Sequence, residues 1–80
     1  MQSYAQPDLH KIKEILNQLL NQESIGDDEN FYEAGLTSIM VLPLLSEIET
    51  SFDLKISDSE FLDARTPKEL AQLVLRLRAS

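Results

Sequence analysis

Two stretches of the chain carry apolar residues at the spacing of an amphipathic helix. In residues 8–20 and 67–77, apolar positions recur every three or four residues, as on one face of a helix. In the first stretch these are Leu9, Ile12, Ile15, Leu16, Leu19 and Leu20, and in the second Leu70, Leu73, Val74 and Leu77. Because most other positions are polar or charged, we expect each helix to turn one face toward a shared core and the other toward solvent.

A third stretch, residues 38–51, is predicted to be helical, but its apolar residues do not fit one face. The positions that follow the helical spacing are Val41, Leu44, Leu45, Ile48 and Phe52. Ile39, Met40, Leu42 and Pro43 are also apolar and cannot all point the same way as that set. We therefore expect an exposed apolar patch on the first two turns, which in a monomer often marks a binding site. The alternative is that the preceding loop covers the patch.

Pro43 conflicts with this helix prediction. Inside a helix, proline cannot donate a hydrogen bond to the carbonyl four residues earlier, here that of Ile39, and its ring clashes there. The cost is about 3 kcal/mol unless the helix kinks. Either the first turn of this helix is loose, or the regular helix begins after Ser38.

Two further segments have the capping patterns that are typical of the beginning of a helix. Residues 57–60 (SDSE) have the form of a capping box that opens a short helix containing Phe61 and Leu62. Residues 66–69 (TPKE) form a second one, in which proline occupies the favoured first helical position. Both patterns therefore predict where a helix begins.

The remaining residues are predicted to be loops. Residues 21–37 contain both glycines and five acids, and a loop of this length is often functional. Phe31 and Leu36 within it are interpreted as packing anchors, and residues 54–56 as a connector. The predicted fold class is all-α, in the order helix, long loop, helix, short helix, helix.

The net charge of −7 is concentrated in the middle of the chain. Residues 23–63 hold eleven acids and a single base, Lys55. Nucleic-acid binding requires a basic footprint, and an anionic membrane surface would repel this segment. The charge therefore argues against both and favours a basic protein partner. The alternative is that the acids only keep a small protein soluble.

The composition leaves little for catalysis or metal binding. The chain has no cysteine, and His10 is its one histidine, so thiolate sites, histidine clusters and a Ser-His-Asp triad have little to build on. Residues 27–29 (DDE) lack the spacing of a calcium loop. We therefore predict no catalytic residues, no metal site and no enzymatic activity.

Length and hydropathy predict one small domain. We assign residues 1–80 to a single domain, with residues 1–7 as a flexible tail. The longest apolar run, residues 39–45, is far shorter than the roughly 20 residues of a membrane helix. Residues 1–7 also lack the features of a secretory signal, so we expect a cytoplasmic monomer that does not bind membranes.

Ser38 is the strongest candidate for chemistry. It follows an acidic loop and Gly35, apolar residues surround it, and it opens a predicted helix. A helix N-terminus favours a phosphate, because free N–H groups and the helix dipole point toward it. The simpler interpretation is that the Ser38 hydroxyl caps the helix.

Three segments resemble the acyl and peptidyl carrier proteins, which hold intermediates on a 4′-phosphopantetheine arm. Residues 28–39 (DENFYEAGLTSI) are similar to the family's acidic loop, phenylalanine, glycine and modified serine. Residues 47–56 (EIETSFDLKI) resemble the end of its second helix and the connector, and residues 65–71 (RTPKELA) the start of its last helix. The resemblance extends from about residue 8 to residue 77 and implies a four-helix carrier-protein bundle.

By this resemblance, Ser38 carries the arm, which a phosphopantetheinyl transferase takes from coenzyme A. A ligase or adenylating enzyme would then load an amino acid or acyl group, which a downstream transferase or synthase would receive. The resemblance and the exposed patch together suggest that partners contact Thr37, Ile39, Met40, Leu42, Pro43 and Glu47. The alternative is a small acidic helical adaptor in which Ser38 is only a helix cap.

Two residues depart from the family's usual motif. Fatty-acid carriers usually have aspartate before the serine, where this chain has Thr37. Peptidyl carriers often have a second glycine where this chain has Leu36. The chain is most similar to free-standing carriers of aminoacyl or specialised acyl groups.

Overall fold

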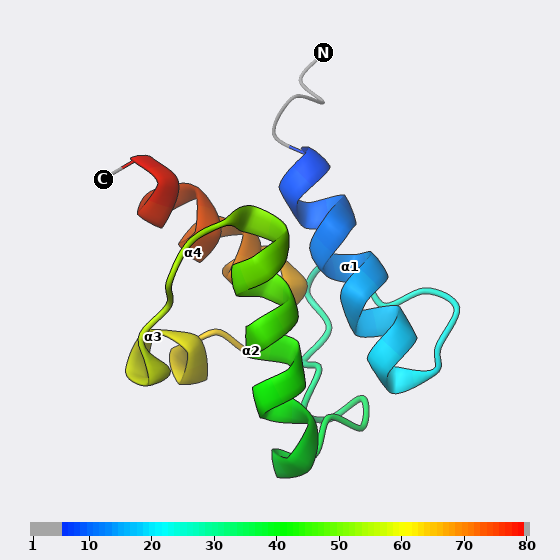
Figure 1. Cartoon of the computed structure of the whole chain (residues 1–80). Coiled ribbons are helices and arrows are strands. Elements are labelled where there is room, and N and C mark those ends of the chain that lie inside the picture. Colours follow the sequence, from blue (N-terminus) through cyan, green and yellow to red (C-terminus); the bar gives the residue numbers. More distant parts are fainter. Residues whose placement is uncertain (1–5, 80) are drawn as a thin grey trace.

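The computed structural model describes residues 6–79, which form four helices and no strand (Figure 1). The helices are α1 (Gln6–Leu20), α2 (Ser38–Phe52), α3 (Asp58–Asp63) and α4 (Pro67–Ala79). The predicted all-α class and the order of the elements are confirmed. Of the predicted tail, residues 1–5 lie outside the described residues, and residues 6 and 7 begin α1.

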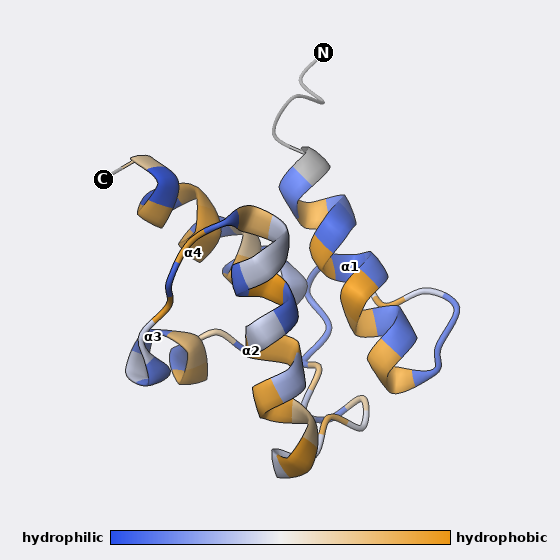
Figure 2. Ribbon diagram, in the orientation of Figure 1, coloured by the Kyte–Doolittle hydropathy of each residue, from blue (hydrophilic) through white to orange (hydrophobic). Residues whose placement is uncertain are grey.

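One apolar core joins all four helices. α1 packs against both α4 and α2, and the buried residues come mainly from the predicted apolar faces. The helical members of the core are Ile12, Ile15, Leu16, Leu44, Leu45, Ile48, Phe61, Leu70, Leu73 and Val74. Along α1, orange and blue positions alternate in Figure 2, as expected for an amphipathic helix. The hydrophobic effect on these faces therefore determines the packing.

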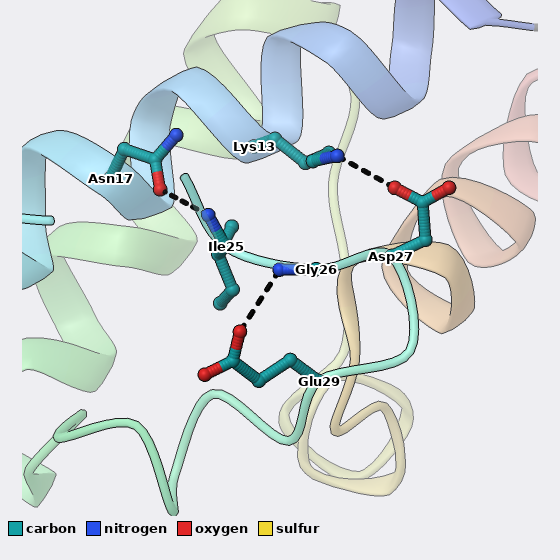
Figure 3. Close-up of polar contacts among 6 residues, drawn as sticks. All are labelled: Lys13, Asn17, Ile25, Gly26, Asp27 and Glu29. Atoms are coloured by element: carbon teal, nitrogen blue, oxygen red, sulfur yellow. Dashed lines mark hydrogen bonds and ion pairs between the residues drawn. The ribbon is translucent and has the colours of Figure 1, made fainter. Parts of the chain in front are cut away.

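The long loop, residues 21–37, is held against α1 at its first half (Figure 3). The backbone N–H of Ile25 donates to the Asn17 side-chain oxygen at 2.9 Å, and the Ile25 side chain is fully buried. The Lys13 ammonium lies 2.7 Å from an Asp27 carboxylate oxygen. These contacts fix the path of a segment that has no regular secondary structure of its own.

Two backbone hydrogen bonds attach the same loop to the start of α4. The N–H of Phe31 donates to the Arg65 carbonyl at 2.9 Å, and the N–H of Lys68 donates to the Asp27 carbonyl at 3.0 Å. Phe31 is fully buried, which confirms its predicted role as a packing anchor. Before it reaches α2, the loop is thus attached both to α1 and to the start of α4.

Both predicted N-cap hydrogen bonds are present. The Ser57 hydroxyl accepts from the Glu60 N–H at 3.2 Å, and the Thr66 hydroxyl accepts from the Glu69 N–H at 3.1 Å. The Glu69 carboxylate accepts at 2.7 Å from the N–H of Arg65, one residue before the cap. The second box therefore closes one residue earlier than the standard pattern, but it satisfies the same number of backbone donors.

Pro43 lies inside α2, which starts at Ser38 and continues to Phe52. Of the two alternatives left open by the sequence, the one in which the regular helix begins after Ser38 is therefore wrong. The first turn is tightened, since the Met40 N–H donates to the Thr37 carbonyl three residues earlier, at 2.9 Å. The helix accommodates the proline without ending at it.

Candidate functional site

Gly35 and Leu36 place the start of α2 at the surface. Gly35 has a φ of +126°, a conformation that side-chain-bearing residues rarely adopt, so glycine is required for this turn. The following residue, Leu36, is buried, and its N–H donates to the Phe31 carbonyl at 3.0 Å. The chain then emerges from the core, and both Thr37 and Ser38 are exposed.

Ser38 does not cap the helix. Thr37 occupies the N-cap position, with extended backbone angles and no side-chain capping bond, and Ser38 is the first helical residue. Within residues 6–79 we find no hydrogen bond to the Ser38 hydroxyl. The adaptor interpretation, in which Ser38 is only a cap, therefore loses the contact on which it depended.

The position of Ser38 suits a phosphodiester. At the N-terminus of a 15-residue helix, the backbone N–H groups of the first turn and the helix dipole favour negative charge. The first turn of α2 contains no acid that would compete. An exposed hydroxyl without a partner in this field is free to become an ester, so the residues present fit the phosphopantetheine group.

The predicted apolar patch is exposed beside Ser38, with one exception. Ile39 is 84% exposed and Leu42 is 72% exposed, and Pro43 is exposed as well. Met40 is only half-exposed and packs against the core, so it is not a fully outward residue. In Figure 2 the first turns of α2 are largely orange, in contrast to the mixed colours of its later turns.

The loop does not cover this patch. Its own apolar side chains, Ile25, Phe31 and Leu36, are buried in the core instead. Burial of the patch by the loop, the alternative raised by the sequence, is therefore wrong. The exposed side chains of the first two turns are available to a partner.

The structure adds Leu62 to the apolar surface. A cavity of about 160 Å³ lies between α2 and α3, and Leu62 on α3 and Leu42 on α2 both line it. The other lining residues are Val41, Leu45, Asp58 and Phe61. Leu62 is 52% exposed, and sequence reasoning did not assign it to the site. No local signal could have done so, because Leu62 reaches α2 only through the tertiary fold.

The acidic residues fall into two classes. Glu47 is exposed on α2, as predicted, whereas Glu49 is half-buried and its carboxylate accepts from the Ile56 N–H at 2.9 Å. In the loop, Asp27 pairs with Lys13 and the Glu29 carboxylate accepts from the Gly26 N–H at 2.9 Å. Glu49, Asp27 and Glu29 therefore support the backbone, and Glu47 is the acid available on the outer face of α2.

Tyr32, in the loop just before α2, has a buried hydroxyl without a hydrogen-bond partner. Its ring lies against that of Phe31, with the ring centroids 5.0 Å apart. Burial raises the pKa of the Tyr32 phenol above its ordinary value of 10.0, and the nearby Arg65 charge partly offsets this. The hydroxyl is therefore a destabilising feature of the loop that positions Ser38.

The titratable groups of residues 6–79 that lie away from Ser38 form no cluster that could hold a metal ion. His10 is a surface residue whose Nε2 lies 3.4 Å from a Glu14 carboxylate oxygen. Residues 6–79 contain no group of three or more His, Asp or Glu side chains that could hold a metal ion. Within the same residues, no helix has the length and hydropathy required to cross a membrane.

Comparison with known proteins assigns the family. Residues 10–74 match the family model described as "Phosphopantetheine attachment site". The chain is 30% identical over 82 residues to the anthracycline acyl carrier protein DpsG of Streptomyces peucetius, and this match covers 95% of the chain and 98% of that protein. It is also 28% identical over 75 residues to CymA of Salinispora arenicola, a probable non-canonical nonribosomal peptide synthetase. This match covers 94% of the chain and 1% of CymA.

Among solved structures, BlmI of Streptomyces verticillus has the same fold. BlmI is described as a type-II acyl carrier protein involved in bleomycin biosynthesis, and the superposition has a TM-score of 0.86 at 23% sequence identity. It covers 94% of this chain and 90% of BlmI. The resemblance inferred from the sequence is thus confirmed. The chain belongs to the phosphopantetheine attachment-site family of carrier proteins, which are carriers rather than enzymes and have 4′-phosphopantetheine as their cofactor.

Proposed function

We propose that Ser38 carries the 4′-phosphopantetheine arm and that the protein is a free-standing carrier. The arm would hold an aminoacyl or acyl group as a thioester and present it to partner enzymes. The observation that carries this proposal is the exposed Ser38 hydroxyl, without a hydrogen-bond partner among the described residues, at the N-terminus of α2. Ser38 also lies within the segment that matches the family model.

The attachment reaction requires only a reactive hydroxyl from this chain. The Ser38 oxygen would form a bond to the phosphorus of coenzyme A that bears the pantetheine, the bond to the nucleotide half would break, and the hydroxyl proton would pass to a base of the transferase. The helix N-terminus would stabilise the resulting phosphodiester. When attached, the arm supplies the thiol that holds the cargo.

The match to DpsG supports a free-standing carrier, and the relatives together leave the kind of cargo open. DpsG, which the match covers almost entirely, is an acyl carrier protein, and the CymA match lies within a peptide synthetase. Both an acyl and an aminoacyl cargo are compatible with these relatives. We propose as partners a phosphopantetheinyl transferase, a loading ligase and a downstream transferase or synthase, with the carrier a cytoplasmic monomer.

Intact-mass measurement tests the proposal. The unmodified protein is incubated with coenzyme A and a broad-specificity phosphopantetheinyl transferase, and peptide mapping then locates the added group. We expect one phosphopantetheinyl group on the wild type and none on Ser38→Ala. The free energy of unfolding of Ser38→Ala should lie within about 0.5 kcal/mol of the wild-type value, because the side chain is exposed and makes no capping bond.

Ser46→Ala is the matched control, since Ser46 is an exposed serine on the same helix. It should be modified as fast as the wild type. Modification of Ser24, Ser46, Ser51 or Ser57 in place of Ser38 would contradict the assignment.

A further inference from the structure

Leu75 is a large apolar side chain that the fold leaves exposed on α4. It is 57% exposed, and it belongs neither to the buried core nor to the half-buried residues that pack against the core. The other exposed large apolar side chains among the described residues are Ile39, Leu42 and Leu62, which lie on α2 and α3. Because a single exposed leucine is common on protein surfaces, its meaning depends on the residues around it.

Three exposed polar residues share the outer face of α4 with Leu75. Lys68, Gln72 and Arg76 follow one another at intervals of four residues, and Leu75 lies three residues after Gln72. Residues at these intervals share one face of a helix. We call Lys68, Gln72, Leu75 and Arg76 the α4 surface. It combines one apolar side chain with two positive charges.

The charge of α4 is opposite to that of the preceding helices. Residues 64–79 contain four bases and one acid, whereas residues 38–63 contain six acids and one base. The acid is Glu69, whose carboxylate accepts from the Arg65 N–H at the beginning of α4. One of the bases, Arg78, lies 2.7 Å from an Asp8 carboxylate oxygen and joins α4 to α1. The α4 surface is therefore locally positive on a protein whose net charge is −7.

Helix stability does not explain the charge of Lys68. This residue is in the first turn of α4, where the helix dipole disfavours a positive charge, whereas Arg76 is in the last turn, where the dipole favours one. Within residues 6–79 the Lys68 ammonium has no ion-pair partner. A glutamate at this position would suit the helix better. The Lys68 charge is therefore available to another molecule.

The α4 surface lies away from Ser38. Figure 1 shows the beginning of α2, which carries Ser38, and the C-terminal end of α4 at opposite ends of the molecule. Leu75 and Arg76 belong to the second half of α4. A protein bound there would leave the surface around Ser38 uncovered.

We propose that the α4 surface binds an acidic segment of a partner protein. Carboxylates of that segment would face Lys68 and Arg76, and an apolar side chain would cover Leu75. A short segment meets only the local positive charge, because charges more than about 8 Å apart are screened at physiological salt. A nucleic acid or an anionic membrane is extended and would also meet the acids of residues 23–63. A second copy of this chain would bring the same net charge of −7.

The protein would then have two contact surfaces of opposite charge. The apolar and acidic surface of α2 serves the enzymes that act on Ser38 or its cargo. The α4 surface would hold a further protein while Ser38 stays accessible. This consequence rests on the proposed function, whereas the binding of an acidic segment to α4 does not.

Amide NMR shifts of the isotope-labelled full chain test this proposal. The probe is a synthetic helical peptide of about 15 residues, with leucine at every third or fourth position and glutamate elsewhere. The control peptide has glutamine in place of every glutamate, and vesicles of anionic phosphatidylglycerol are a second probe. All titrations are run at about 0.1 M salt, where the Debye length is roughly 10 Å.

We expect the acidic peptide to shift the amide signals of the α4 surface and to leave that of Ser38 unchanged. Leu75→Ala should weaken binding about fivefold or more, because apolar contact is lost. Lys68→Glu should weaken binding about threefold or more, yet melt no lower than the wild type. The matched control is Lys55→Glu, which reverses an exposed lysine outside α4 and should bind within about twofold of the wild type.

Four results would overturn the proposal. The first is the absence of peptide binding, and the second is a set of shifted signals on α2 instead of α4. The third is equal binding of the glutamate and glutamine peptides, or equal weakening by Lys68→Glu and Lys55→Glu, since charge at α4 would then be irrelevant. The fourth is binding to the vesicles without binding to the peptide.

A modification assay separates this inference from the proposed function. With the acidic peptide bound, the phosphopantetheinyl transferase should modify Ser38 at the rate measured for the free protein. Inhibition by the peptide would show that it covers Ser38 and would overturn the α4 assignment. If Ser38 is not modified even without peptide, the proposed function fails and the binding to α4 stands.

Discussion

The outer faces of α1 and α2 differ, although both helices have 15 residues and both turn an apolar face to the same core. Between residues 8 and 20 of α1, the exposed residues are all polar: His10, Lys11, Glu14 and Gln18. The exposed residues of α2 begin with Ser38, Ile39, Leu42 and Pro43 before they become polar. α1 thus shows what the fold alone requires of a helix here, and the additional apolar residues of α2 serve something other than folding.

The largest expected effect separates the two faces of α2. Leu44 is fully buried, and Leu44→Ala should lower the free energy of unfolding by about 2–5 kcal/mol. Leu42→Ala removes an equal number of atoms from an exposed position and should change the free energy of unfolding by about 0.5 kcal/mol or less. Chemical denaturation measures both values. Equal losses would show that the outer face of α2 also contributes to folding.

Met40 lies between these two cases. The sequence predicts that Met40 contacts partners, but the residue is half-buried and packs against the core. Met40→Ala and Met40→Glu should therefore reduce the melting temperature as well as the loading rate, Met40→Glu more strongly because it places a charge against apolar neighbours. Leu42→Ala is the control, since it should slow loading at nearly wild-type stability.

Single charge reversals distinguish the acid on α2 from an acid in the loop. At low salt, Glu47→Lys should slow association with the transferase by about two- to tenfold, whereas Asp28→Lys in the loop should have a smaller effect. Asp28 is the appropriate control because Asp27 and Glu29 make structural contacts, so their reversal would also destabilise the loop. Stopped-flow association rates at increasing ionic strength measure the effect. Equal effects at the two positions would mean that association depends on the net charge of the protein and not on where the charge lies.

Added salt should have the opposite effect on the isolated protein. The acids of residues 23–63 repel one another in the folded state, and screening should therefore raise the melting temperature. The same screening should slow the association. A melting temperature that is independent of salt would show that this repulsion is negligible.

The smallest expected effect concerns the loop that delivers Ser38 to the surface. Tyr32→Phe removes a buried hydroxyl without a partner and should raise the free energy of unfolding by about 1 kcal/mol. Because the folded-state pKa of Tyr32 is raised, the folded protein retains this proton longer than the unfolded chain, and stability should fall as the pH rises above 10.0. Tyr32→Phe should lessen that fall, and denaturation at pH 7 and pH values above 10.0 compares the two proteins.

Local patterns predicted the helices because the physics that forms them is local. The amphipathic faces of α1 and α4 and the caps at Ser57 and Thr66 depend on residues at most four positions apart. For the same reason the exposure of Ile39 and Leu42 followed from a helix with too many apolar residues for one face. The candidate serine was identified from its neighbours in the chain. The family of the protein was identified from three short segments that occur in the expected order along the chain.

Other features depended on the tertiary structure, because they join residues that are distant in the chain. Sequence alone could not show that Thr37, not Ser38, is the N-cap, since both are plausible caps and the difference lies in one backbone angle. It could not place Leu62 beside α2, or attach the loop to α4 through Phe31 and Arg65. The helices and the candidate serine were thus determined by local sequence. The surface around that serine was determined by long-range packing, which leaves no periodic signal.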